Sequence, residues 1–204
     1  MNIVKASYVI ESTPTVEDMK KLEKRGRVCY KSEDKITEES YVRFLSMIVK
    51  RGHFSVIEHE YASVTFTIDR GVSHEMVRHR LASFSQESTR YVNYAKGEYT
   101  DNIAFVDPLF FGHGSEKFKI WMSAMDEAER HYNWLIAEGA RPEEARTVLP
   151  NSLKTEICVT TNLRHWREIF KQRCSKAAHP QMREVMQPLL AEFKQLIPII
   201  FDDI

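Results

Sequence analysis

Hydrophobic and polar positions follow two different periods along this chain, and each period predicts a different element. Residues 61–68 alternate between apolar and polar side chains, which is typical of a half-buried strand. Across residues 37–51 the apolar side chains recur at i, i+3, i+4 and i+7, counted from Tyr41. Gly52 follows that pattern as a helix stop. The two segments therefore predict one strand and one helix.

The same patterns divide the rest of the chain. Predicted strands cover residues 3–10, 103–106 and 155–161, and predicted helices cover residues 16–30, 72–80, 115–138, 141–148, 163–174 and 180–201. Thr15 and Asn162 are the expected N-caps of two of these helices. Residues 69–71 are expected to turn the chain, and the glycines of residues 110–114 predict a loop. Strands and helices do not form regular βαβ units, so the pattern predicts an α+β fold with a mixed or antiparallel sheet flanked by helices.

The longest predicted helix, residues 115–138, carries one apolar stripe. Its members are Phe118, Trp121, Met122, Met125, Tyr132 and Leu135. Stripes at helical spacing are most often part of a hydrophobic core, and we interpret this one as core.

Length and composition indicate an ordinary globular protein. With 204 residues, of which 43% are hydrophobic and 28% charged, the chain suits one domain over residues 1–204, or two closely packed halves. Lys and Arg (29) balance Asp and Glu (29), which argues against general nucleic-acid binding because that function needs a broad basic surface. Three widely spaced cysteines disfavour a disulfide framework and a structural zinc site. No signal peptide or membrane span is evident, so we expect a cytoplasmic protein with no membrane partner.

Candidate chemistry concentrates in residues 78–91, Arg-His-Arg-Leu-Ala-Ser-Phe-Ser-Gln-Glu-Ser-Thr-Arg-Tyr. Guanidinium groups match phosphate oxygens and stay charged at physiological pH, and hydroxyl groups complete such a site. One interpretation is therefore an anion-recognition segment for a phosphorylated small molecule. The alternative is a solvated helix end followed by a polar loop. On the predicted helix at 72–80, His74 and Arg78 lie one turn apart, as do Glu75 and His79, so their side chains should converge.

Three other places carry chemically capable residues. Residues 53–59 hold two histidines and a glutamate, but the order of a zinc-binding helix is absent and no helix is indicated, so packed histidines are favoured over a metal site. Arg146 is interpreted as an exposed helix arginine paired with Glu143. Arg173 fits an ordinary cation near a helix C-terminus. No Gly-rich nucleotide loop is present, so a bound nucleotide would be held by side chains and strand-loop backbone.

Arg78-His79-Arg80, followed at fixed spacing by Ser83, Ser88 and Arg90, resembles the motif of the flavin-dependent thymidylate synthases. Residues 53–59, 143–150 and 162–179 are similar to further pieces of that family. The resemblance implies the family's α+β fold and the reductive methylation of dUMP to dTMP. It also implies methylenetetrahydrofolate as carbon donor, FAD reduced by NADPH as hydride source, and a homotetramer whose subunits share each site. It implies no metal.

The resemblance also assigns roles to residues. It places at the FAD cofactor the residues Ser55, Arg78, His79, Arg80, Gln86, Asn162, Leu163, Arg164 and Glu168. It places at the dUMP substrate the residues Glu75, Met76, Val77, Arg78, Gln86, Glu87, Ser88, Thr89, Arg90, Arg146 and Arg173. Arg173 is the expected catalytic residue, because a guanidinium beside the O2/N3 edge of uracil would stabilise the charge that makes C5 nucleophilic.

Two other function classes remain open on the sequence. The first is a non-catalytic module that senses nucleotides or phosphate with the same arginines. The second, less favoured, is a single-stranded RNA binder that combines Arg78, Arg80 and Arg90 with nearby aromatic side chains.

Overall fold

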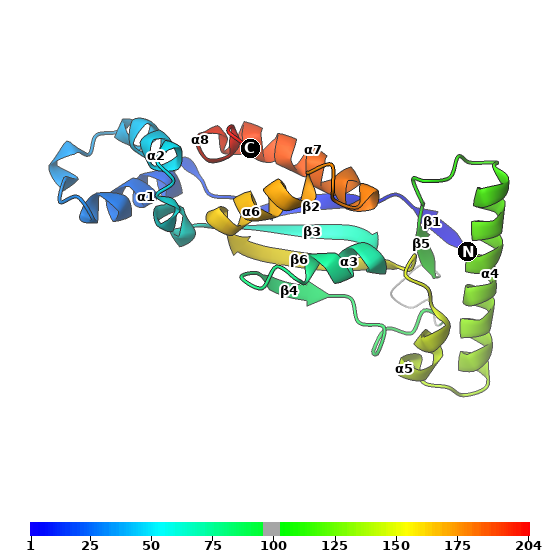
Figure 1. The fold of residues 1–204 in the computed structure, drawn as a ribbon. Coiled ribbons are helices and arrows are strands. Elements are labelled where there is room, and N and C mark those ends of the chain that lie inside the picture. Colours follow the sequence, from blue (N-terminus) through cyan, green and yellow to red (C-terminus); the bar gives the residue numbers. More distant parts are fainter. Residues whose placement is uncertain (96–102) are drawn as a thin grey trace. The chain divides into compact units, whose positions relative to one another are not determined.

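The computed structural model describes residues 1–95 and 103–204. The chain divides into two compact units. The first comprises residues 1–7, 66–78 and 85–157, and the second comprises residues 8–65, 79–84 and 158–204. A four-stranded antiparallel sheet has the order β2 (Ser7–Ser12), β3 (Tyr61–Asp69), β6 (Lys154–Asn162) and β4 (Ser83–Gln86) (Figure 1). The predicted fold class, α+β with helices flanking the sheet, is confirmed.

In the second unit, helices cover the strands around an aromatic core. Its elements are α1 (Val16–Val28), η1 (Glu33–Lys35), α2 (Ser40–Lys50), η2 (Phe54–His59), α6 (Leu163–Arg173), α7 (Pro180–Leu196) and α8 (Pro198–Phe201). Figure 1 shows α6 and α7 along one face of the strands. Trp166 fixes α6 to β3 by donating its indole N–H to the Ala62 carbonyl at 3.0 Å. Phe170, Phe193 and Phe201 pack edge to face with one another, and the Phe170 ring also stacks on Trp166.

A buried cation ties α6 to the last residues of the described chain. Arg167 is 1% exposed, and its two terminal nitrogens donate to the Asp203 carboxylate at 2.6 and 2.7 Å. It also donates to the Ile200 carbonyl. The guanidinium lowers the pKa of Asp203, as expected for a carboxylate that accepts two charge-assisted hydrogen bonds. Removing Asp203 would leave a buried charge unpaired.

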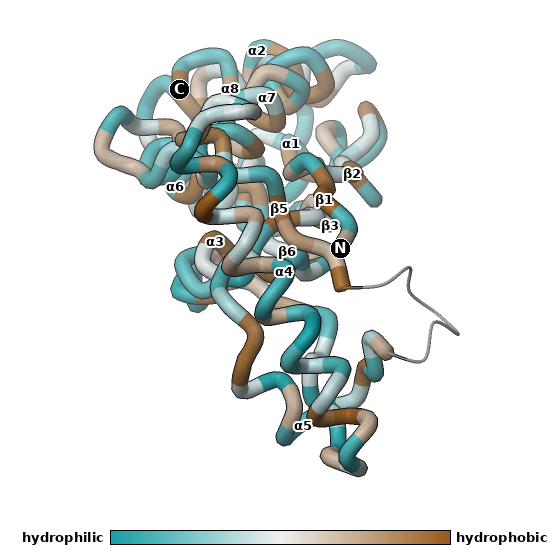
Figure 2. Tube along the Cα trace, turned by 90° about the vertical axis from the view of Figure 1, so that its right-hand side faces the viewer, coloured by the Kyte–Doolittle hydropathy of each residue, from teal (hydrophilic) through white to brown (hydrophobic). Residues whose placement is uncertain are grey.

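The first unit has a smaller core. β1 (Asn2–Val4) pairs in parallel with β5 (Ala104–Val106), with Ile3 opposite Phe105. This unit also contains α3 (Arg70–Met76), α4 (Glu116–Ala137), α5 (Pro142–Ala145) and η3 (Arg146–Val148). Phe105, Met125, Tyr132 and Leu153 lie at the centre of the core. Figure 2 shows hydrophilic and hydrophobic residues mixed along α4.

Helix caps follow the sequence closely. Thr15 and Asp18 form a complete capping box at the start of α1. Asn162 caps α6, and Ser115 caps α4. Gly52 and Gly139 end their helices in the left-handed region that favours glycine. These boundaries were predictable because a cap depends on its own side chain and on backbone groups only two or three residues away.

Four expectations about elements were wrong. The predicted strand at residues 3–10 is two strands, β1 and β2, in different sheets. Residues 69–71 do not turn the chain, because the Asp69 carboxylate accepts from Val72 N–H at 2.8 Å and so starts α3. That helix ends at Met76, well before the predicted residue 80. Residues 54–59 form the 3₁₀ helix η2 where no helix was indicated.

Smaller differences concern the motif and two helices. Part of the motif, for which no strand was predicted, is the strand β4. Of the stripe predicted on α4, Met125 and Tyr132 are buried in the core, and Trp121 and Leu135 pack against that core while partly exposed. The final helix breaks at Ile197, whose backbone leaves the helical region because Pro198 follows it. No helix in the described ranges is long and apolar enough to span a membrane.

Candidate active site

A cavity of about 350 Å³ lies in the second unit where β6 passes into α6. It is lined by Glu58, Leu81, Asn162, Arg164, His165 and Glu168. The Asn162 side chain accepts from His165 N–H at 2.8 Å, and this cap starts α6. Arg164, His165 and Glu168, from the first two turns of α6, lie together at the cavity. Leu81 is held on the opposite side by its carbonyl, which accepts from the Thr161 hydroxyl at 2.7 Å.

The lining combines charge with exposed apolar surface. Arg164 donates to the Glu58 carboxylate at 2.6 Å, and both side chains are more than 40% exposed. Leu81 is 74% exposed, which is high for leucine in a folded chain. The His165 Nε2 atom is buried and has no hydrogen-bond partner among the described residues. A buried polar atom of this kind needs an explanation, and a bound ligand would supply one.

Beside this cavity, the motif meets the end of α6. Arg173 donates its Nε–H to His79 Nε2 at 2.9 Å, across 94 positions of sequence. The His79 ring also lies edge to face with His165, at 5.7 Å between centroids. Burial lowers the pKa of His79 to about 4, and the neighbouring Arg173 and His165 act in the same direction. His79 is therefore neutral at physiological pH, as an acceptor for a guanidinium must be.

The first unit gathers the hydroxyl groups and arginines expected at a phosphate. Thr89 is buried, and its hydroxyl accepts from Arg146 at 3.2 Å. Arg90 donates to the Glu143 carboxylate at 2.8 Å, and the Ser88 hydroxyl accepts from Arg90 N–H at 3.2 Å. The predicted pairing of Arg146 with Glu143 was wrong, because Glu143 pairs with Arg90 and Arg141 instead.

Gln86 and Glu87 anchor the motif in the first unit. Gln86 donates to the hydroxyls of Ser73 and Thr155 at 2.9 and 3.2 Å. The Glu87 carboxylate accepts from the Tyr94 hydroxyl at 2.8 Å and from Glu156 N–H at 3.2 Å. Burial, with Glu87 beside it, raises the pKa of Tyr94 well above its usual value.

The remaining residues that the resemblance assigns to FAD or dUMP lie outside these two clusters. Ser55 and Arg80 are exposed in the second unit and are not part of the cavity lining. Leu163 is buried in the core, and its backbone N–H donates to the Glu60 carbonyl at 3.0 Å. In the first unit Glu75 is partly buried, Met76 is fully buried, and Val77 and Arg78 are exposed just beyond α3. Because α3 ends at Met76, the predicted one-turn spacing to Arg78 and His79 was wrong.

Sequence reasoning missed His165 and Glu58, which line the cavity. A signal for His165 existed, because the residue three positions after an N-cap lies in the first helical turn beside the capping side chain. A signal for Glu58 was weaker, because the 3₁₀ helix that carries it was not indicated. No group of His, Cys, Asp and Glu in the described part of the chain could hold a metal ion.

Comparison with known proteins identifies relatives along nearly the whole chain. Residues 9–199 match the family model described as "Thymidylate synthase complementing protein". The flavin-dependent thymidylate synthase of Geobacter sulfurreducens is 36% identical over 187 residues, covering 87% of this chain and 78% of that protein. The enzyme of the same name from Clostridium tetani is 30% identical over 218 residues, covering 95% of this chain and 84% of that protein.

A solved structure agrees at the level of fold. The crystal structure of a UMP/dUMP methylase from Streptomyces cacaoi bound with 5-Br dUMP superposes with a TM-score of 0.79 at 20% identity. The match covers 99% of this chain and 96% of the other. Together with the family model and the identities above, these matches show that the chain belongs to the flavin-dependent thymidylate synthase family of enzymes.

Proposed function

We propose that this enzyme, as one domain over residues 1–204, converts dUMP to dTMP by reductive methylation. Methylenetetrahydrofolate provides the carbon and NADPH is the reductant. FAD, when bound and reduced, supplies the hydride that completes the methyl group. The observation that carries the proposal is the 2.9 Å hydrogen bond between His79 and Arg173, because it joins two distant pieces of the family pattern in one unit.

The second unit fits part of a flavin nucleotide. Its 350 Å³ cavity lies within the usual size range of small-molecule sites. The exposed Leu81 offers apolar surface to a ring, and the buried His165 Nε2 lacks a partner that a ligand would provide. The residues proposed to hold FAD are Ser55, Arg78, His79, Arg80, Gln86, Asn162, Leu163, Arg164 and Glu168. Asn162, Arg164 and Glu168 already share the cavity lining.

The first unit supplies the proposed phosphate contacts of dUMP. Ser88, Thr89, Arg90 and Arg146 would bind the phosphate, because hydroxyls and guanidinium forks match its oxygens. The remaining residues proposed to line the nucleotide site are Glu75, Met76, Val77, Arg78, Gln86 and Glu87. Because Met76 is fully buried, it would support the nucleotide site from the core.

Arg173 is the proposed catalytic residue. Attack by C5 of uracil requires electron density to build up on the O2/N3 edge, and a guanidinium placed there stabilises that charge where it develops. The bond from Arg173 Nε to neutral His79 fixes the plane of the guanidinium. His79 is thus a positioning residue as well as a proposed cofactor contact. Cys174, beside Arg173, is a poor nucleophile because burial raises the pKa of its thiol to about 11.

We also propose a cytoplasmic homotetramer in which subunits share each site. Three free cysteines suit a reducing compartment. Ser55, Arg78 and Arg80 are exposed on the chain, so they are open to ligands or neighbours from other subunits.

The test of the mechanism is single-turnover dTMP formation by an Arg173→Lys variant with verified flavin content. Lysine keeps the charge but loses the planar fork, so we expect the chemical step to slow by about 10²–10³-fold. A variant with serine at Cys29, Cys158 and Cys174 should stay within roughly tenfold of the parent rate if it folds. Parent-like turnover in Arg173→Lys would refute the assigned role. So would a folded, flavin-bound cysteine-free protein that makes no dTMP.

A further inference from the structure

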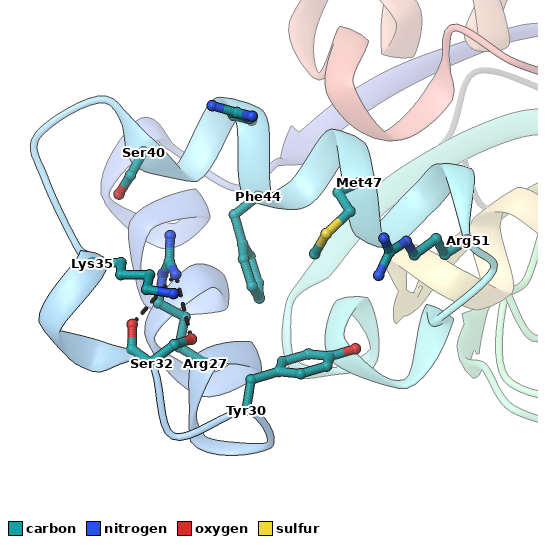
Figure 3. Close-up of a pocket in the computed structure, with 9 residues that line it drawn as sticks. Arg27, Tyr30, Ser32, Lys35, Ser40, Phe44, Met47 and Arg51 are labelled. Atoms are coloured by element: carbon teal, nitrogen blue, oxygen red, sulfur yellow. Dashed lines mark hydrogen bonds between the residues drawn. The ribbon is translucent and has the colours of Figure 1, made fainter.

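A second cavity, of about 770 Å³, lies between α1, η1 and α2 of the second unit, apart from the site above. Its lining includes Tyr30, Lys35, Arg43, Phe44, Met47 and Arg51. Figure 3 shows Lys35 and Arg27 at one end, Arg51 at the other, and Phe44 and Met47 between them. The volume lies in the usual range of small-molecule sites.

The cavity carries unbalanced positive charge. Arg27 is already paired, because it donates to Glu23 at 2.7 Å and lies over the Phe44 ring. The charged groups of Lys35, Arg43 and Arg51 have no hydrogen-bond or ion-pair partner among residues 1–95 and 103–204. The lining contains no carboxylate. Cations that converge on one hollow without acidic partners create a local positive potential that attracts anions.

The spacing of the positive charges indicates what shape of anion would fit the cavity. Arg43, Met47 and Arg51 follow each other at intervals of four residues and so lie along one face of α2. Eight residues of helix separate the two arginines by about 12 Å along the axis, so an extended anion matches their spacing better than one compact phosphate does. Phe44, Met47 and the Tyr30 ring supply apolar surface between the charges. The site therefore suits an elongated molecule that carries several oxyanion groups.

One hydrogen bond connects this cavity to the proposed flavin site. The Tyr30 hydroxyl and His53 Nδ1 lie 2.9 Å apart. His53 directly precedes η2, which carries Ser55 and Glu58. Glu58 lines the smaller cavity. A ligand held between α1 and α2 thus lies beside the segment that supplies proposed flavin contacts.

We propose that the cavity between α1, η1 and α2 binds the oxyanion-bearing tail of a co-substrate whose reactive end reaches the flavin site. This inference rests on the proposed function for the identity of the co-substrates. Two of them carry suitable tails: the γ-linked glutamate carboxylates of a polyglutamylated folate, and the phosphates of NADPH. Both present several anionic oxygens along an extended chain.

The experiment compares an Arg43→Gln/Arg51→Gln double variant of the full-length protein with a Lys24→Gln/Lys50→Gln control. The control removes the same charge from exposed positions on α1 and α2 that do not line the cavity. Equilibrium dissociation constants are measured for mono- and pentaglutamyl methylenetetrahydrofolate, for NADPH and NADH, and for tripolyphosphate. Circular dichroism confirms folding, which we expect to be unaffected because the replaced arginines have no partners.

The parent and the control should both bind the more anionic ligand of one pair more tightly. That ligand is the pentaglutamyl form in the folate pair, or NADPH in the dinucleotide pair. The double variant should reduce that preference by about tenfold or more, as expected for lost charge-assisted contacts. Loss of the pentaglutamyl preference identifies the folate tail, and loss of the NADPH preference identifies the dinucleotide. Equal dissociation constants in the double variant and the parent would overturn the inference, as would an equal effect in the control. Tripolyphosphate binding that depends on Arg43 and Arg51 in a protein that makes no dTMP would support this site while refuting the proposed function.

Discussion

At the scale of single residues, the interaction between His79 and Arg173 depends on the protonation of one nitrogen. The Arg173 Nε–H can be donated only to an unprotonated ring nitrogen, and the lowered pKa of His79 keeps that nitrogen available. A motif in the sequence reveals which residue types are present. It does not reveal that a histidine will be buried between a guanidinium and a second imidazole, because those neighbours come from distant segments.

We therefore predict a specific pH dependence of stability. The pKa of His79 is about 4 in the folded protein and about 6.5 in the unfolded chain, so the unfolded chain takes up the proton first as pH falls. The contribution of His79 to stability is fully present above pH 6.5 and is lost progressively toward pH 4. Urea unfolding of the parent should show this decline, and a His79→Gln variant should show less of it. Identical pH profiles for parent and variant would contradict the assignment.

Arg90 provides a second prediction at this scale. Arg90→Ala should weaken dUMP binding by roughly ten- to over a hundredfold, because a charge-assisted phosphate contact is lost. Hydride chemistry at saturating dUMP should change much less, since the phosphate contact is the same in ground and transition states. Arg141→Ala is the matched control, because Arg141 also pairs with Glu143 but has no proposed ligand. Equilibrium dialysis with labelled dUMP measures both variants, and an unchanged dissociation constant for Arg90→Ala would place the phosphate elsewhere.

At the scale of elements, a helix or strand boundary could be predicted when the interactions that set it lie within a few residues in the sequence. Thr15 and Asn162 act on their own helices, and both caps were predicted from the sequence. The division of residues 3–10 into β1 and β2 depends on β5 and β3, about 100 and 50 positions away, so alternation alone could not reveal it. The strand β4 was missed for the same reason. Its side chains are mostly polar, as in a loop, and its strand conformation depends on pairing with the distant strand β6.

Asn162 allows the roles of cap and ligand contact to be separated. Asn162→Ala should lower the free energy of unfolding by about 0.5–2 kcal/mol, because α6 loses its N-cap. Asn162→Asp keeps the accepting oxygen and should retain most of that stability. If the Asn162 amide N–H group also contacts the flavin, the aspartate variant should still bind FAD more weakly. Fluorescence titration with FAD and urea unfolding measure the two effects, and parent-like FAD affinity in the aspartate variant would limit Asn162 to capping.

At the scale of the whole molecule, the proposed homotetramer predicts a particle of four times 23.9 kDa, about 96 kDa. Light scattering on the flavin-bound protein measures this mass directly. Subunit sharing also predicts that flavin is released when the protein is diluted to the point of dissociation. A monomer that retains full flavin content would contradict shared sites.

The two units are interleaved in sequence, since each is built from three separate segments. No single cut in the chain yields one whole unit. The first and the second unit therefore cannot be exchanged separately by a single recombination event. A recombination event with one crossover would join fragments of both. Gene shuffling within this family is therefore expected to preserve both units only when it respects all five boundaries between them, four of which lie inside the strands β2, β3, β4 and β6 while one follows α3.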